Sequence, residues 1–110
     1  IVDCINKLDN YDAVSTVVNP IDTIVETNKE NNKIIEVLER ELYKLEQTPQ
    51  GFIYNIILDA HKKIKEDTTD DIKIAHKYGV KCGIIDGAYS NFKVTTDFDY
   101  QIAQLILKDK

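Results

Sequence analysis

The sequence predicts an α/β fold from two kinds of pattern. Residues 13–18 and 80–86 are rich in β-branched and aliphatic side chains and predict strands, while apolar residues at helical spacing predict helices before, between and after them. Helices this apolar need a sheet to cover, yet the sequence offers too few core strands to close a doubly wound sheet. We therefore expect the 110 residues to be an incomplete part of an α/β domain.

The first third of the chain predicts a helix, a strand and a hairpin. Residues 1–10 carry one apolar face and predict the end of a helix, and the strand at 13–18 follows. Residues 22–27 and 33–38 flank the polar turn 28–32, an arrangement typical of a β-hairpin. Such a thin, polar hairpin does not fold unsupported, so we expect it to project from the body and to pack on something else.

The middle of the chain predicts a loop and a helix. Residues 40–50 have little periodicity and end in Gln-Thr-Pro-Gln, so we expect a loop. A helix is predicted from about 51 to 65, with lysines and a histidine in its last turn, where cations stabilise the helix dipole. The apolar residues of its expected buried face are Phe52, Ile53, Ile56, Ile57, Ala60 and Ile64.

A second helix is predicted directly afterwards. Thr69 is a good N-cap residue, and Asp70 and Asp71 suit the positive end of the helix dipole. This helix is expected to run to about Tyr78 and to stop at Gly79, a typical C-terminal glycine.

The last third predicts a strand, an extended segment and a helix. After the strand at 80–86, Gly87 turns the chain and residues 91–95 are expected to be extended. Thr96, with Asp99 three residues later, predicts a capped final helix. Its apolar positions are Phe98, Ile102, Leu105 and Ile106.

Composition excludes several classes of protein. A net charge of −5 and a pI near 4.9 argue against a nucleic-acid partner, and no apolar run approaches the roughly 20 residues of a membrane helix. Cys4 and Cys82 match no metal or redox spacing, so we expect a reduced, cytoplasmic protein with two buried thiols. His61 and His76 each stand alone, which argues against a metal site. The chain begins with Ile1 and contains no methionine, so we expect it to be part of a longer one.

Four short stretches carry a resemblance to a known family. The order and spacing of these stretches resemble those in the C-terminal half of the sugar-phosphate cytidylyltransferases. This family includes the 2-C-methyl-D-erythritol 4-phosphate and D-ribitol-5-phosphate enzymes. The stretches are Asp22-Thr23-Ile24; Arg40-Glu41-Leu42-Tyr43 with Gln47-Thr48-Pro49-Gln50-Gly51-Phe52; Thr69-Asp70-Asp71; and Asn91-Phe92-Lys93-Val94-Thr95-Thr96 with Asp99. Leu45-Glu46 departs from the pattern, because a glycine is expected near this point.

The resemblance implies the C-terminal part of a Rossmann-like nucleotidyltransferase sheet, covering residues 1–110 as one portion of a single domain. The hairpin, at about 19–45, would be an arm that reaches the partner subunit of a homodimer. The family's glycine-rich nucleotide loop belongs to an N-terminal half that is absent here, so no CTP-binding residue is carried over. The complete protein would be an enzyme that joins CMP from CTP to a sugar phosphate and releases pyrophosphate, whereas this portion alone would be inactive.

The resemblance also implies site residues. Arg40, the single arginine, would position the acceptor phosphate, and Lys93 would orient the same phosphate beside the α-phosphate. Thr23, Thr48 and Thr69 would bind substrate. Each residue also has a plain structural reading: a surface arginine, a solvated lysine, a strand threonine, a turn threonine and a helix N-cap.

Further expectations concern the cofactor and the acceptor. Mg²⁺ is expected to bind mainly through CTP and the absent half, with no metal ligand in this chain. The residues after Asp22-Thr23-Ile24 and around Tyr43 favour ribitol 5-phosphate as the acceptor, with 2-C-methyl-D-erythritol 4-phosphate as the alternative. Two other readings remain open: a non-catalytic dimerisation fragment, and a stand-alone α+β protein whose resemblance is accidental.

Overall fold

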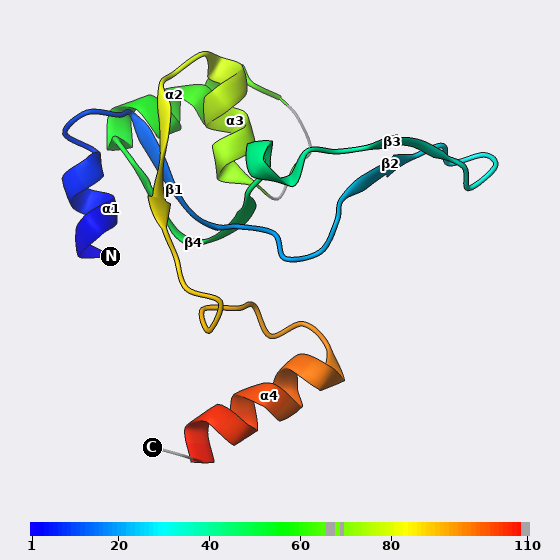
Figure 1. The fold of residues 1–110 in the computed structure, drawn as a ribbon. Helices are drawn as coiled ribbons and strands as arrows, with labels where there is room; N and C mark the ends of the chain where they lie inside the picture. The colour runs from blue at the N-terminus through cyan, green and yellow to red at the C-terminus, as the bar shows by residue number, and fades with distance from the viewer. Residues whose placement is uncertain (66–67, 69, 109–110) are drawn as a thin grey trace.

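The structure, a computed structural model, describes residues 1–65, 68 and 70–108. The chain contains both helices and strands, and a thin hairpin and the last helix extend away from the body (Figure 1). The helices are α1 (Val2–Lys7), η1 (Arg40–Leu42, a 3-10 helix), α2 (Tyr54–Lys63), α3 (Asp71–Tyr78) and α4 (Asp97–Lys108). The strands are β1 (Ala13–Val18), β2 (Val25–Thr27), β3 (Ile34–Val37), β4 (Leu45–Phe52) and β5 (Cys82–Asp86).

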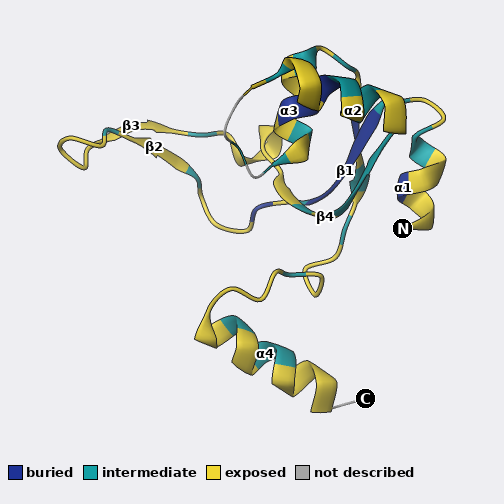
Figure 2. Cartoon of the chain, turned by 180° about the vertical axis from the view of Figure 1, so that it is seen from behind, coloured by how far each residue is buried: buried dark blue, intermediate teal, exposed yellow. Residues whose placement is uncertain are grey.

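Strand β1 is the centre of a mixed sheet with the order β4-β1-β5. It pairs in parallel with β5 and antiparallel with β4. Residues 13–17 are all buried, which is why both faces of this strand carry small or β-branched side chains and no charged residue alternates with them. The strand predicted at 13–18 is confirmed, and the buried residues gather around it (Figure 2). The rest of the described core is Cys4, Ala60, Ile74 and Ala75.

Strand β4 corrects the sequence analysis, which predicted a loop over residues 40–50. Its partner β1 supplies the hydrogen bonds, and the register shifts so that Thr48 and Pro49 have no opposite residue. The Thr16 hydroxyl donates to the Pro49 carbonyl at 2.6 Å across this bulge. Polar side chains and a proline are tolerated in an edge strand with a bulge, so this segment lacks the apolar pattern of a central strand.

Helices α2 and α3 cover the sheet side by side. Helix α2 is shorter than the predicted 51–65, because residues 51 and 52 complete β4. Of its predicted buried face, Ala60 is buried, whereas Ile53 remains 37% exposed. Helix α3 is capped by Asp70, whose carboxylate accepts from the Ile72 amide at 3.2 Å. Thr69, the predicted cap, lies outside the described residues.

Gly79 ends α3 in the left-handed conformation, with φ of 93°. Its amide donates to the carbonyl of His76 at 3.0 Å, as the sequence predicts for a C-terminal glycine.

We expect Gly79→Ala to lower the free energy of unfolding by about 1 kcal/mol, because a Cβ disfavours this backbone conformation. No heavy atom lies within 4 Å of the position of that Cβ, so crowding adds nothing. Urea unfolding followed by circular dichroism measures the change, with Asp9→Ala at an exposed position as control. Equal stabilities of the Gly79 variant and the wild type would contradict the prediction.

The hairpin predicted around residues 28–32 is confirmed. Strands β2 and β3 pair antiparallel, and the Asn28 amide donates to the Lys33 carbonyl at 2.9 Å to close the turn. All residues of both strands are exposed, and the hairpin projects from the body (Figures 1 and 2). Its exposed apolar side chains are Val25, Ile34, Ile35 and Val37.

Helix α4 is capped as predicted: the Asp99 amide donates to the Thr96 hydroxyl and the Thr96 amide to the Asp99 carboxylate, both at 3.1 Å. The hydrogen bonds that the Asp99 carboxylate accepts from Thr95 and Thr96 lower its pKa, and the bond from the Thr95 backbone amide contributes most. The apolar positions of the helix are largely exposed, Phe98 at 69% and Leu105 at 64%.

Three further expectations concern the cysteines, residues 91–95 and membrane-spanning helices. Cys4 is buried as predicted, but Cys82 is only partly buried, which corrects the expectation of two buried thiols. Residues 91–95 lie between β5 and α4, outside any helix or strand. No helix among the described residues is long and apolar enough to cross a membrane.

Candidate functional site

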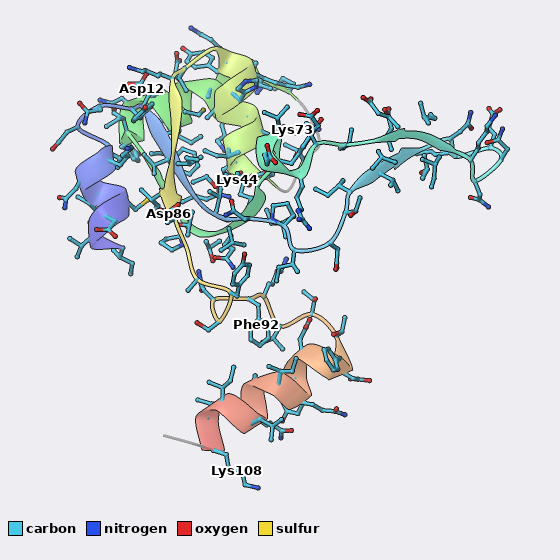
Figure 3. All side chains as sticks on the ribbon, viewed as in Figure 1. Asp12, Lys44, Lys73, Asp86, Phe92 and Lys108 are labelled. Carbon is cyan, nitrogen blue, oxygen red and sulfur yellow. The ribbon has the colours of Figure 1, made fainter. Side chains whose placement is uncertain are left out.

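A pocket of about 360 Å³ lies between strand β4 and the segment that joins β5 to α4. It brings together two residues that the sequence analysis singled out, Thr48 and Lys93. Thr48 comes from the bulge of β4, and Lys93 follows the turn after β5, next to Phe92 (labelled in Figure 3). The complete lining is Glu46, Gln47, Thr48, Gln50, Asn91, Phe92 and Lys93.

The two sides of the pocket approach closely because Gly87 has no side chain. The Gly87 amide donates to the Val17 carbonyl at 2.8 Å, which holds the turn after β5 against the end of β1. A Cβ at Gly87 would lie 2.4 Å from Oε1 of Gln47 and 2.8 Å from Cγ2 of Thr16. The glycine therefore lets the chain that leads to Lys93 pass directly beside β4.

The pocket holds one positive and one negative side chain. Lys93 is exposed, and within the described part of the chain its ammonium has no hydrogen bond or ion pair, so its charge is available to a ligand. Glu46 accepts a hydrogen bond from Nε2 of Gln50 at 2.9 Å. Partial burial raises the pKa of the Glu46 carboxyl, and the charge of Asp70 acts in the same direction.

The remaining predicted residues lie elsewhere in this chain. Arg40 starts η1 at the foot of the hairpin and lines a different pocket, together with Pro20 and Lys44. Its guanidinium donates to the carbonyl of Ile21. Thr23 is exposed on the segment that enters the hairpin, and Thr69 lies outside the described residues. The chain thus groups Thr48 with Lys93, and it groups Arg40 with the base of the hairpin.

The expected glycine near Leu45-Glu46 is not required by the backbone. Both residues pair in regular register, Leu45 with Val18 and Glu46 with Val17. Among the described residues, positive φ values occur only at Asn32 and Gly79. Glu46 instead places a carboxylate in the pocket, which the sequence analysis did not foresee.

Sequence analysis quoted Gln47, Gln50 and Asn91 only as parts of motifs and assigned them no role. All three contribute amide groups to the pocket. The signal that could have found them is their position, since each lies within two residues of Thr48 or Lys93. No group of three or more His, Cys, Asp or Glu side chains that could hold a metal ion occurs among residues 1–65, 68 and 70–108.

The fold is that of solved nucleotidyltransferase structures. It matches 4-diphosphocytidyl-2C-methyl-D-erythritol synthase from Anaerococcus prevotii with a TM-score of 0.85 and 27% identity, covering 97% of this chain and 51% of that one. The fold also matches 2-C-methyl-D-erythritol 4-phosphate cytidylyltransferase from Thermus thermophilus with a TM-score of 0.82 at 24% identity, covering 97% of this chain and 53% of the other. The predicted fold class is confirmed, and the fold is the one seen in solved cytidylyltransferases.

Sequence comparison gives the particular family. Residues 1–109 match the family model described as IspD: 2-C-methyl-D-erythritol 4-phosphate cytidylyltransferase, and the chain belongs to this family. The curated relative from Bacillus mycoides that carries this enzyme name is 36% identical over 108 residues, which are 96% of this chain and 47% of that protein. A relative from Clostridium botulinum strain Langeland with the same name is 40% identical, over 96% of this chain and 45% of its own length.

These comparisons confirm the resemblance inferred from the four motifs and make an accidental likeness untenable. The chain spans about half the length of the curated relatives it matches. The relatives carry the name of the methylerythritol enzyme, which the sequence analysis held as the alternative to ribitol 5-phosphate.

Proposed function

We propose that the whole protein transfers CMP from CTP to 2-C-methyl-D-erythritol 4-phosphate and releases pyrophosphate. The observation that carries the proposal is the family match over residues 1–109. The pocket supports it, because Lys93 offers an unpaired ammonium to a phosphate and the side chain of Thr48 offers a hydroxyl for hydrogen bonding. Ribitol 5-phosphate, favoured by the sequence alone, becomes the competing acceptor in the test.

The chemistry requires positioning rather than an activated side chain. An oxygen of the acceptor phosphate attacks the α-phosphorus of CTP, the bond to the β-phosphate oxygen breaks, and pyrophosphate leaves. The acceptor phosphate is already an anionic nucleophile, so no general base is needed. What the site must supply is positive charge and hydrogen-bond donors aimed at phosphate oxygens. Lys93, Arg40, Thr23, Thr48 and Thr69 are the proposed contributors from this chain.

The proposal includes Mg²⁺ bound through the phosphates of CTP, because hard phosphate oxygens are ligands that this ion prefers. The ion would offset the negative charge that accumulates as pyrophosphate leaves. Residues of this chain are assigned no part in holding it.

The proposal also includes a homodimer joined through the hairpin, called here the arm (residues 19–45). The exposed side chains of Val25, Ile34, Ile35 and Val37 support it, since a two-stranded hairpin that exposes apolar side chains is stable only when another surface covers it. A second copy of the chain can be this covering surface, because in a dimer with a two-fold axis the arm of each copy packs on the other copy. The arm would carry Arg40 and Thr23 toward the partner's pocket.

We expect light scattering to give the mass of a dimer for the protein. The double substitution Ile35→Glu and Val37→Glu should lower the measured mass to that of a monomer. The charged side chains would have to be desolvated in the proposed interface. Lys29→Glu alone, at the hairpin turn, changes the net charge by the same amount and is the control for added negative charge. A monomeric wild type, or a dimer that the β3 substitutions leave intact, would refute the arm as the interface.

The function is tested by pyrophosphate release from CTP. The assay uses the protein at the full length of its relatives, because this chain spans about half of that length. Equal concentrations of 2-C-methyl-D-erythritol 4-phosphate and ribitol 5-phosphate are compared in parallel. Faster release with the methylerythritol compound supports the proposal, faster release with ribitol 5-phosphate transfers it to that acceptor, and release with neither contradicts it.

A further inference from the structure

Two amide side chains tie the segment that carries Lys93 to the strand that carries Thr48. Nε2 of Gln47, in β4, donates to the Ala88 carbonyl at 3.0 Å. Nδ2 of Asn91 donates in the opposite direction, to the Thr48 carbonyl at 2.5 Å, with Oε1 of Gln47 at 3.4 Å. The two sides of the pocket are thus joined by reciprocal hydrogen bonds.

The surrounding contacts make this connection specific. The Asn91 amide donates to the Ala88 carbonyl at 3.0 Å, so the carbonyl that receives Gln47 also closes the turn that ends at Asn91. The absence of a side chain at Gly87 is what allows Gln47 to reach it, since a Cβ there would lie 2.4 Å from Oε1. These contacts fix the chain up to two residues before Lys93.

Lys93 itself has no such anchor. Its ammonium has no partner within the described residues, and residues 91–95 belong to no helix or strand. The position of the charge therefore depends on what holds the backbone just before it. The reacting groups of a phosphoryl transfer must be placed to within about 1 Å, and a displacement of that size can cost about 100-fold in rate.

We infer that Gln47 and Asn91 are positioning residues, which set the place of the Lys93 ammonium relative to Thr48 and so the place of the acceptor phosphate. The inference rests on the proposed function, because it assigns Lys93 to phosphate binding. Neither amide needs to touch substrate for this role. Their effect on the reaction passes through Lys93.

The test is a double-mutant cycle on pyrophosphate release by the full-length protein, with Asn91→Ala and Lys93→Ala singly and together. Asn91→Ala alone should lower kcat/KM about 10- to 100-fold, by displacing the lysine. In the Lys93→Ala background the same change should cost less than about twofold, because the group it positions is already gone. A second cycle with Gln47→Leu, which keeps the size of the side chain and removes its donor, should give the same pattern.

Asn10→Ala, which removes an exposed amide outside this pocket, is the control and should leave kcat/KM unchanged. If Asn91→Ala and Gln47→Leu each lowered kcat/KM equally in the wild-type and Lys93→Ala backgrounds, the inference would be overturned and the proposed function would stand. A wild type that releases no pyrophosphate would refute the proposed function and the positioning role together. Amide hydrogen exchange over residues 87–93 distinguishes displacement of this segment from loss of the lysine alone. The inference requires faster exchange in the Gln47 and Asn91 variants and unchanged exchange in Lys93→Ala.

Discussion

Replacing Lys93 with alanine should lower kcat/KM by the equivalent of about 2–4 kcal/mol, the range seen when one donor to a developing oxyanion is removed. The reason is that the lysine supplies an unpaired positive charge to the pocket that also contains Thr48. The measurement is steady-state pyrophosphate release at varied acceptor concentration in the full-length protein. Lys93→Arg keeps the charge but changes its geometry, so it should restore only part of the loss.

The same substitution should leave the fold intact. Lys93 is exposed and makes no contact that an alanine would break, so the free energy of unfolding should change by less than about 0.5 kcal/mol. Lys73→Ala is the matched control for loss of one positive charge, because Lys73 is also exposed but lies on α3 (Figure 3). Equal activity of Lys93→Ala and Lys73→Ala would remove Lys93 from the site.

The contrast between β1 and β4 explains how much of the fold could be predicted from the sequence. Strand β1 is buried along most of its length, so its residues are small or β-branched and none is charged, and the pattern reveals it. Strand β4 lies at the edge of the described sheet and contains a bulge, so proline, glycine and polar residues occur within it. Its conformation is set by pairing with β1, which is a long-range contact that local periodicity does not encode.

The candidate site could be predicted in part for a similar reason. Motif resemblance found Thr48 and Lys93, and the structure brings these two together although they are distant in the sequence. Glu46 was missed as a pocket residue, because a carboxylate beside a proposed phosphate site is not expected from charge alone. The roles of Gln47 and Asn91 depend on which carbonyl each amide reaches, and that follows only from the register of β4 and the turn after Gly87.

Arg40, which lines a different pocket from Lys93, is the second residue whose replacement should strongly lower kcat/KM. Arg40→Ala should also lower kcat/KM by the equivalent of about 2–4 kcal/mol, because the change removes the guanidinium proposed to bind the acceptor phosphate in bidentate fashion. Arg40→Lys should recover little, since an ammonium cannot reproduce the planar fork. Within one chain the arginine lines a pocket with Pro20 and Lys44, apart from the one that contains Lys93. In the proposed arm exchange, Arg40 of one copy would lie beside Lys93 of the other.

Mixed dimers distinguish this arrangement from one in which both residues serve the same chain's site. If Arg40 acts on the partner's pocket, a heterodimer of Arg40→Ala and Lys93→Ala chains has one doubly defective site and one intact site. Random pairing of the two inactive variants should then restore about a quarter of the wild-type activity. If each chain supplies its own Arg40 and Lys93, every site retains one defect and the mixture stays as inactive as its parents. Co-expression of the two variants with different affinity tags allows the heterodimer to be purified, and with one of its two sites intact it should then have about half of the wild-type activity.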